Sequence, residues 1–168
     1  MIKLWNGVNN NKERKVKMGL DMYLEKRIYI GALYDFNKVE GTIDITVRGE
    51  KVNINFNKVS HIVEEAAYWR KANQIHNWFV ENVQNGTDDC KYYYVSKQQL
   101  QELIDTCKEV LADHDKAPDL LPTCSGFFFG DTNYDEYYYE DLEYTVKRLE
   151  YVLANASDRD AFYYNSSW

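Results

Sequence analysis

The feature that most constrains this chain is a strict alternation of apolar and polar residues in two stretches. Residues 19–30 read GLDMYLEKRIYI, so Leu20, Met22 and Leu24 would point to the same side of an extended chain. Residues 42–56 repeat the alternation on either side of a turn. Because successive side chains of a strand point to opposite faces, this pattern predicts half-buried strands, and residues 42–56 should form a β-hairpin with one face on the core.

Three later stretches show the spacing of amphipathic helices instead. Residues 68–83 place apolar side chains at helical intervals, with an alternative start of this helix near Ser60. Ser96 opens a capping box, which predicts a helix over residues 97–113. Residues 131–154 begin with carboxylates and end with basic residues, the charge order that a helix dipole favours. We therefore expect three helices.

Two short aromatic stretches complete the expected sheet. KYYYV at residues 91–95 and GFFFG at residues 126–130 are β-prone and too short for helices. The sequence predicts one α+β domain over residues 18–155, with a mostly antiparallel sheet of about four to five strands packed against about three helices. Residues 156–168 are expected to be a loose C-terminal tail with aromatic anchors.

The charge of the chain is uneven. The formal net charge is −7, but residues 1–17 hold five basic residues and one acidic residue, a net +4, so the chain from Met18 onward carries −11. The polar, Asn-rich leader lacks periodicity, which is typical of a flexible arm. An upstream in-frame start or added sequence ahead of a natural start at Met18 is the simplest explanation. A basic arm that contacts something acidic is the alternative.

Composition argues against several classes of protein. An acidic chain is a poor binder of nucleic acid, because phosphate neutralisation needs clustered Lys and Arg. No apolar run reaches the length of a membrane span and the N-terminus is charged, so we expect a cytoplasmic protein. Cys90, Cys107 and Cys124 lack CxxC spacing and are expected to be thiols, neither paired nor bound to zinc.

The first candidate site is the stretch YWRKANQIHNWF, residues 68–79. A helix would place Asn73 and His76 one turn apart beside its apolar stripe. One hypothesis is a pocket wall that binds a base and phosphate, or a small anion, through stacking, a charged fork and amide groups. The other is that Asn73 and His76 only fasten the helix to a strand edge or a loop carbonyl. The candidate ligand-binding residues are Trp69, Arg70, Asn73, His76 and Asn77.

The second candidate site is the acidic stretch within residues 126–143, which contains six carboxylates and no basic residue. Its opening imitates a calcium loop, but Glu136 stands where that loop requires glycine and Leu142 where it requires a bidentate glutamate. A looser divalent-cation site through Asp131 and Asp135 and a solvated helix turn remain as alternatives. A further alternative is a face that imitates nucleic acid and docks on a basic groove. Its partner-binding candidates are Asp131, Asp135, Glu136, Tyr138, Glu140 and Asp141.

Three motifs in order resemble a widespread family of small tailed-phage and prophage proteins that begin GLDMYL. They are MGLDMYLEKR at residues 18–27, YWRKANQIHNWF at residues 68–79 and FFFGDTNYDEYYYEDL at residues 127–142. The resemblance covers Met18 to about Leu153 and supports Met18 as the natural first residue. It carries over no catalytic residue. It implies a phage accessory gene, the class from which anti-defence and host-takeover proteins come.

These observations favour a binding protein. We expect a non-enzymatic inhibitor in the cytoplasm of the host bacterial cell, without a cofactor, whose acidic face binds a host defence protein with a basic surface, such as a CRISPR nuclease. One alternative is a sponge that sequesters a nucleotide immune signal in the predicted Trp69 and Arg70 pocket. Another is a metal-dependent phosphoesterase that uses Asp131 and Asp135. We expect no direct contact with nucleic acid or membrane, and a homo-oligomer is compatible with the sequence.

Overall fold

The computed structural model describes residues 19–31, 41–126 and 128–168. The predicted leader over residues 1–17 lies outside the described residues.

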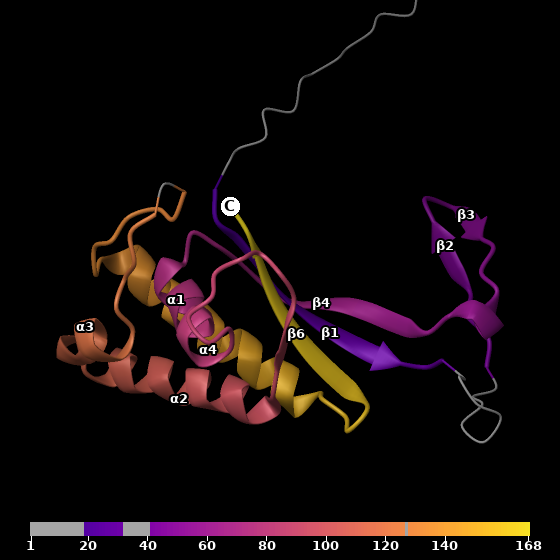
Figure 1. Cartoon of the computed structure of the whole chain (residues 1–168). Helices are drawn as coiled ribbons and strands as arrows, with labels where there is room; N and C mark the ends of the chain where they lie inside the picture. Colours follow the sequence, from indigo (N-terminus) through magenta and orange to yellow (C-terminus); the bar gives the residue numbers. More distant parts are fainter. Residues whose placement is uncertain (1–18, 32–40, 127) are drawn as a thin grey trace, which may run out of the picture.

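A four-stranded antiparallel sheet organises the described part of the chain (Figure 1). Strand β1 (Asp21–Tyr29) pairs with β4 (His61–Arg70) on one side and with β6 (Asp160–Ser167) on the other. Strand β5 (Tyr93–Val95) pairs with β6, which gives the order β4-β1-β6-β5. The predicted single-domain α+β fold with a mostly antiparallel sheet is confirmed.

The helices gather on one side of this sheet (Figure 1). They are α1 (Asn73–Asn82), α2 (Lys97–Ala112), the short α3 (Ala117–Leu120) and α4 (Glu136–Ala154), with 3₁₀ turns η2 (Phe56–Lys58) and η3 (His114–Lys116). The predicted capping box is present, because the Ser96 side chain accepts from the Gln99 amide and the Gln99 side chain accepts from the Ser96 amide. No helix in the described ranges has the length and apolarity needed to cross a bilayer.

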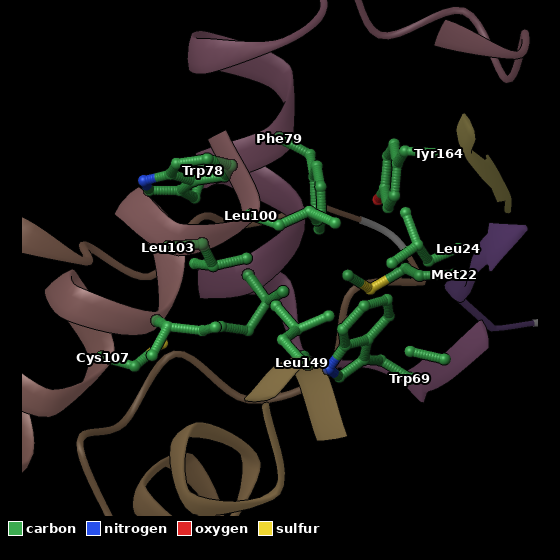
Figure 2. Packing of buried hydrophobic residues seen from close by; sticks show 14 of the residues in the cluster. Met22, Leu24, Trp69, Trp78, Phe79, Leu100, Leu103, Cys107, Leu149 and Tyr164 are labelled. Carbon is green, nitrogen blue, oxygen red and sulfur yellow. The ribbon is translucent and has the colours of Figure 1, made fainter. Parts of the chain in front are cut away.

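The hydrophobic core lies between the sheet and the helices. Met22, Leu24 and Tyr164 point from the strands toward Leu100 and its neighbours on α2 (Figure 2). The rings of Phe79 and Tyr164 stack with their centroids 3.9 Å apart, so α1 packs directly on β6. These side chains are fully buried. Their burial is the main source of stability for the fold.

Two contacts fix α4 against β4. The indole nitrogen of Trp69 donates to Thr145 Oγ1 over 2.9 Å, and both residues are buried. Arg148 Nε donates to the carbonyl oxygen of Ala66 over 2.5 Å. Ala66 lies at a β-bulge, where Glu65 and Ala67 pair with consecutive residues of β1 and Ala66 is left over. The bulge therefore directs one unpaired carbonyl of β4 toward α4.

The structure corrects the predicted helix over residues 68–83. Residues 61–70 are the strand β4, and the helix begins only at Asn73. Trp69 and Arg70 thus lie on a strand, and only three of the five candidate ligand-binding residues share α1. The bulge at Ala66 explains the error, because it places two consecutive buried residues, Ala66 and Ala67, where a strand should alternate.

Three further predictions were wrong in position or role. The hairpin forms as β2 (Ile45–Val47) and β3 (Glu50–Val52), but every residue of both strands is exposed, and the hairpin stands away from the helices (Figure 1). The expected tail contains β6, an interior strand of the sheet. Residues 126 and 128–130, expected as a buried strand, form a loop with a turn.

Candidate functional site

Residues from both predicted sites line one pocket with a volume of about 400 Å³. Arg70, Lys71 and Gln74 come from the junction between β4 and α1. Most of the other lining residues come from the loop before α4 and the first turns of α4. Its carboxylates are Asp131, Asp135, Glu140 and Asp141, with Tyr137 and Tyr138 beside them. Two stretches that the sequence separates by about 60 positions thus form a single charged site.

The junction between β4 and α1 places two basic residues on the pocket wall. Lys71 has a positive φ of 61°, and its backbone amide donates to the Leu20 carbonyl over 2.8 Å. Gly130 faces it with a φ of 90°, and a Cβ at Gly130 would lie 3.1 Å from the Cβ of Lys71. Glycine is therefore favoured there by its positive φ, and a larger residue would also crowd the Lys71 side chain. Arg70 Nε lies 3.8 Å from Asp21 Oδ1 on the neighbouring strand.

The buried side chain of Asn73 positions the loop that forms the acidic wall. Its amide nitrogen donates to the carbonyl oxygens of Phe129, over 3.2 Å, and Asp131, over 2.7 Å. Its amide oxygen accepts from the Cys124 backbone amide over 2.9 Å. Tyr138 adds a second connection, since its hydroxyl donates to the Leu121 carbonyl over 2.8 Å. The hypothesis that Asn73 fastens the helix to loop carbonyls is confirmed.

The acidic wall is ordered by local hydrogen bonds. Asp135 caps α4, because its Oδ1 accepts from the Tyr138 backbone amide over 3.2 Å. Asp131 Oδ1 accepts from the Asn133 amide over 3.1 Å within the preceding loop. Glu140 lies one turn further along α4. These bonds fix the directions of the two aspartates before any ligand arrives.

Asp141 is the least solvated carboxylate of the pocket. Its Oδ2 accepts from Gln74 Nε2 over 3.2 Å. The pKa of Asp141 is raised to about 6, mainly by burial; the hydrogen bond from Gln74 lowers it, and the nearby charges of Glu140 and Asp135 raise it. A positive charge placed beside Asp141 would therefore favour its ionised form.

Besides Asn73, two of the predicted ligand-binding residues are in the interior. The Trp69 side chain is 2% exposed and the His76 side chain 1%, and neither lines the pocket. His76 Nδ1 lies 2.7 Å from the Tyr164 hydroxyl and its Nε2 lies 3.0 Å from Asp88 Oδ2. Through these two contacts the His76 ring links α1, β6 and the loop after α1.

The remaining candidates divide between the pocket and its surroundings. Asn77 is half-buried on α1 and Glu136 is exposed on the first turn of α4, and neither lines the pocket. Tyr138 lines it but is only 4% exposed, and burial raises the pKa of its hydroxyl far above the usual range. Its hydroxyl is therefore a structural donor at neutral pH.

Neither a cysteine–histidine nucleophile nor a metal-binding cluster is supported in the part of the chain that the structure describes. Burial and the charge of Asp88 raise the pKa of Cys124, and both nitrogens of His76 have other partners, so these residues do not form a thiolate and imidazolium pair. No three His, Cys, Asp or Glu side chains come together there as ligands of a metal ion would.

Lys71 and Gln74 were not predicted as site residues from the sequence, although both belong to the first candidate stretch, residues 68–79. A helix that starts at residue 68 would present Asn73 and His76 beside its apolar stripe, and these two residues were predicted instead. The observed boundary, with β4 ending at Arg70 and α1 beginning at Asn73, changes which side chains face the loop. The sequence signal that could have identified Lys71 is its position in a polar break between a strand and a helix.

Comparison with known proteins identifies no relative: no family model, no curated protein and no solved structure matches this chain.

Proposed function

We propose that this protein is a phage-encoded accessory protein that inhibits a host defence protein by binding it. The target class is a nucleic-acid-handling effector of the CRISPR type, whose basic groove the acidic wall of the pocket would occupy. The observation that supports this proposal most directly is the convergence of Asp131, Asp135, Glu140 and Asp141 on one pocket.

Charge and order both favour such a docking surface. The chain from Met18 onward has a net charge of −11, which would steer it toward a basic partner. The capping bond with Tyr138 fixes the side chain of Asp135, and Asn73 holds the loop that contains Asp131. Binding would therefore have to order few further groups of this surface. Exposed Tyr137 adds an aromatic side chain of the kind that is enriched in protein interfaces.

The geometry favours this function over the two alternatives. A nucleotide would bring phosphates next to four carboxylates, and of the five residues predicted for a nucleotide pocket only Arg70 lines it. A metal-dependent phosphoesterase needs a set of cation ligands around Asp131 and Asp135, and the described residues do not provide a third.

A charge-reversal experiment tests the proposal. Asp131, Glu136 and Glu140 are exposed and would be changed to Lys together, while Asp135 and Asp141 stay because they cap α4 and contact Gln74. The matched control reverses Glu81, Glu102 and Asp105, which are exposed elsewhere and give the same change in net charge.

The readout is inhibition of purified CRISPR-type nucleases in the presence and absence of competing nucleic acid. We expect the wild type and the control to inhibit at least one nuclease in competition with its nucleic acid, and the pocket variant to lose inhibition by about tenfold or more. Equal inhibition by the two triple variants, or no inhibition by the wild type of any effector in the panel, would contradict the proposal.

A further inference from the structure

The pocket contains charges of both signs, because Arg70 and Lys71 line it together with four carboxylates. Lys71 lines the pocket together with Asp135 and Asp141, and no ion pair or side-chain hydrogen bond involves its ammonium group within the described ranges. Its backbone has a left-handed conformation that a lysine rarely adopts. A ligand with positive charge alone would satisfy the carboxylates but would be repelled by Lys71.

Gln74 provides an unused acceptor on the inner side of the pocket. The residue is 3% exposed, and its Nε2 donates to Asp141. Its Oε1 has no hydrogen-bond partner among residues 19–31, 41–126 and 128–168. Because Gln74 lines the pocket, a ligand that offers an N–H group to this oxygen would gain a hydrogen bond that the protein alone does not make.

We infer that the pocket binds a basic residue that carries a free carboxylate, as arginine does at the C-terminus of a chain or as the free amino acid. The guanidinium group lies at Gln74 and the carboxylate wall, and the α-carboxylate lies at Lys71. This inference rests on the proposed function and deepens it, because it states which group of a basic partner enters the pocket.

The guanidinium group fits this set of acceptors better than an ammonium group. It is planar and presents five N–H donors in a fixed fork, whereas an ammonium is a compact, strongly hydrated charge. The pocket offers the Gln74 oxygen and the carboxylate of Asp141 side by side, and Asp135 also lines it. The volume of about 400 Å³ is within the range of small-ligand pockets.

Calorimetric titration of the full chain with three small molecules tests the inference. The probes are L-arginine, agmatine, which lacks the carboxylate, and citrulline, which has a neutral urea in place of the guanidinium. We expect arginine to bind, and agmatine and citrulline to bind about tenfold more weakly or worse, the effect of losing a hydrogen bond between charged groups. Agmatine binding as tightly as arginine, or no binding of any probe, would overturn the inference.

Variants assign each end of the ligand. Lys71→Met should weaken arginine binding by about tenfold and leave agmatine binding unchanged or tighter. Asp141→Asn should weaken both. Lys147→Met is the control, because Lys147 is exposed on α4 away from the pocket and should change neither. If Lys71→Met tightens arginine binding, the carboxylate does not lie at Lys71 and the assignment is wrong.

Peptides distinguish the two sources of this ligand. A peptide ending in arginine with a free carboxylate is compared with its C-terminal amide and with free arginine. Tighter binding of the free-acid peptide than of arginine indicates a chain terminus, and the reverse order indicates the amino acid. Equal binding of the acid and the amide would contradict the inference. Loss of nuclease inhibition with arginine binding intact would contradict only the proposed function, and the converse would contradict only the inference.

Discussion

Single buried polar side chains determine where the charges of the pocket lie. Asn73 makes three hydrogen bonds to the backbone of the loop that contains Asp131, and Gln74 contacts Asp141 directly. Neither amide is exposed. The charged surface of the pocket is thus positioned by neutral side chains beneath it, and a change to one of them should alter the site without changing its charge.

Replacing Asn73 by Ala should destabilise the fold and release the loop. The Cys124 amide would lose its acceptor, and the carbonyls of Phe129 and Asp131 would lose their donor. We expect a loss of roughly 2–3 kcal/mol in the free energy of unfolding, measured by urea denaturation, and faster hydrogen exchange at Cys124. Asn77→Ala on the same helix is the control and should cost less than about 1 kcal/mol. Unchanged exchange at Cys124 would contradict this role.

Replacing Asp141 by Asn should stabilise the protein at neutral pH. The pKa of Asp141 is raised from 3.8 to about 6 in the folded state, so its ionisation is less favourable there than in the unfolded chain. The contribution of Asp141 to stability is greatest below pH 3.8 and is lost as the pH rises through about 6. We expect the variant to gain about 1 kcal/mol at neutral pH, allowing for solvent screening.

The measurement for Asp141 is the free energy of unfolding of both proteins across this pH range. The difference between variant and wild type should shrink as the pH falls from about 6 toward 3.8. A difference that stays constant with pH would show that lost contacts, and not the desolvated charge, account for the effect. Glu143→Gln, an exposed neighbour on α4, provides the comparison and should show little change.

At the scale of elements, a capping box and two side-chain bonds place the helices. The Ser96 box begins α2, and the bonds from Trp69 to Thr145 and from Arg148 to Ala66 hold α4 on β4. Because α4 provides Glu140 and Asp141, these contacts also fix the acidic side of the pocket. Helix placement and site geometry are therefore coupled through β4.

Replacing Ser96 by Ala should weaken α2 without affecting the pocket. The change removes the acceptor of the Gln99 amide and should lower the free energy of unfolding by about 1 kcal/mol. Thermal unfolding and arginine titration of the same sample measure the two effects. Ser125→Ala, at an exposed loop position, is the control for the loss of a hydroxyl. A loss of binding that exceeds the loss of stability would contradict the separation of α2 from the site.

Elements with a regular local pattern could be predicted, and irregular ones could not. The alternation from Leu20 to Leu24 and the Ser96 cap gave β1 and α2 nearly at their observed bounds. Strand β4 was missed because its bulge at Ala66 interrupts the alternation. Strand β6 was missed because its polar residues, such as Asn165 and Ser166, obscure that it is buried between two strands. Prediction of the pocket would have required the boundary between β4 and α1. Hydrophobic spacing alone does not define that boundary.

At the scale of the whole molecule, the sheet connects parts of very different stability. Strand β6 lies between β1 and β5 and carries Phe162 and Tyr164 into the core, whereas the hairpin of β2 and β3 is exposed throughout. An isolated two-stranded hairpin is marginal in water, so the hairpin contributes little to the fold. The core and the hairpin should therefore respond differently to deletion.

Two deletions test this difference. Replacing residues 43–55 by a short Gly-Ser linker should leave the melting temperature within about 3 °C of the wild type, because no core residue is removed. Removing residues 160–168 should abolish cooperative unfolding, since β5 loses its strand partner and the core loses Phe162 and Tyr164. Circular dichroism during heating measures both. A cooperative transition in the second variant would show that the sheet does not depend on β6.

The position of β6 also determines when the protein can fold during its synthesis. In the described sheet β5 has no strand neighbour except β6, and β6 follows the other three strands of that sheet along the chain. While a ribosome is still translating α4, β1 can pair only with β4. The edges of β1 and β5 that later pair with β6, and the apolar side chains that β6 covers, stay exposed until β6 is made. The acidic pocket can be complete before the sheet that supports it, so the nascent chain depends on the synthesis of β6, or on chaperones, to avoid aggregation.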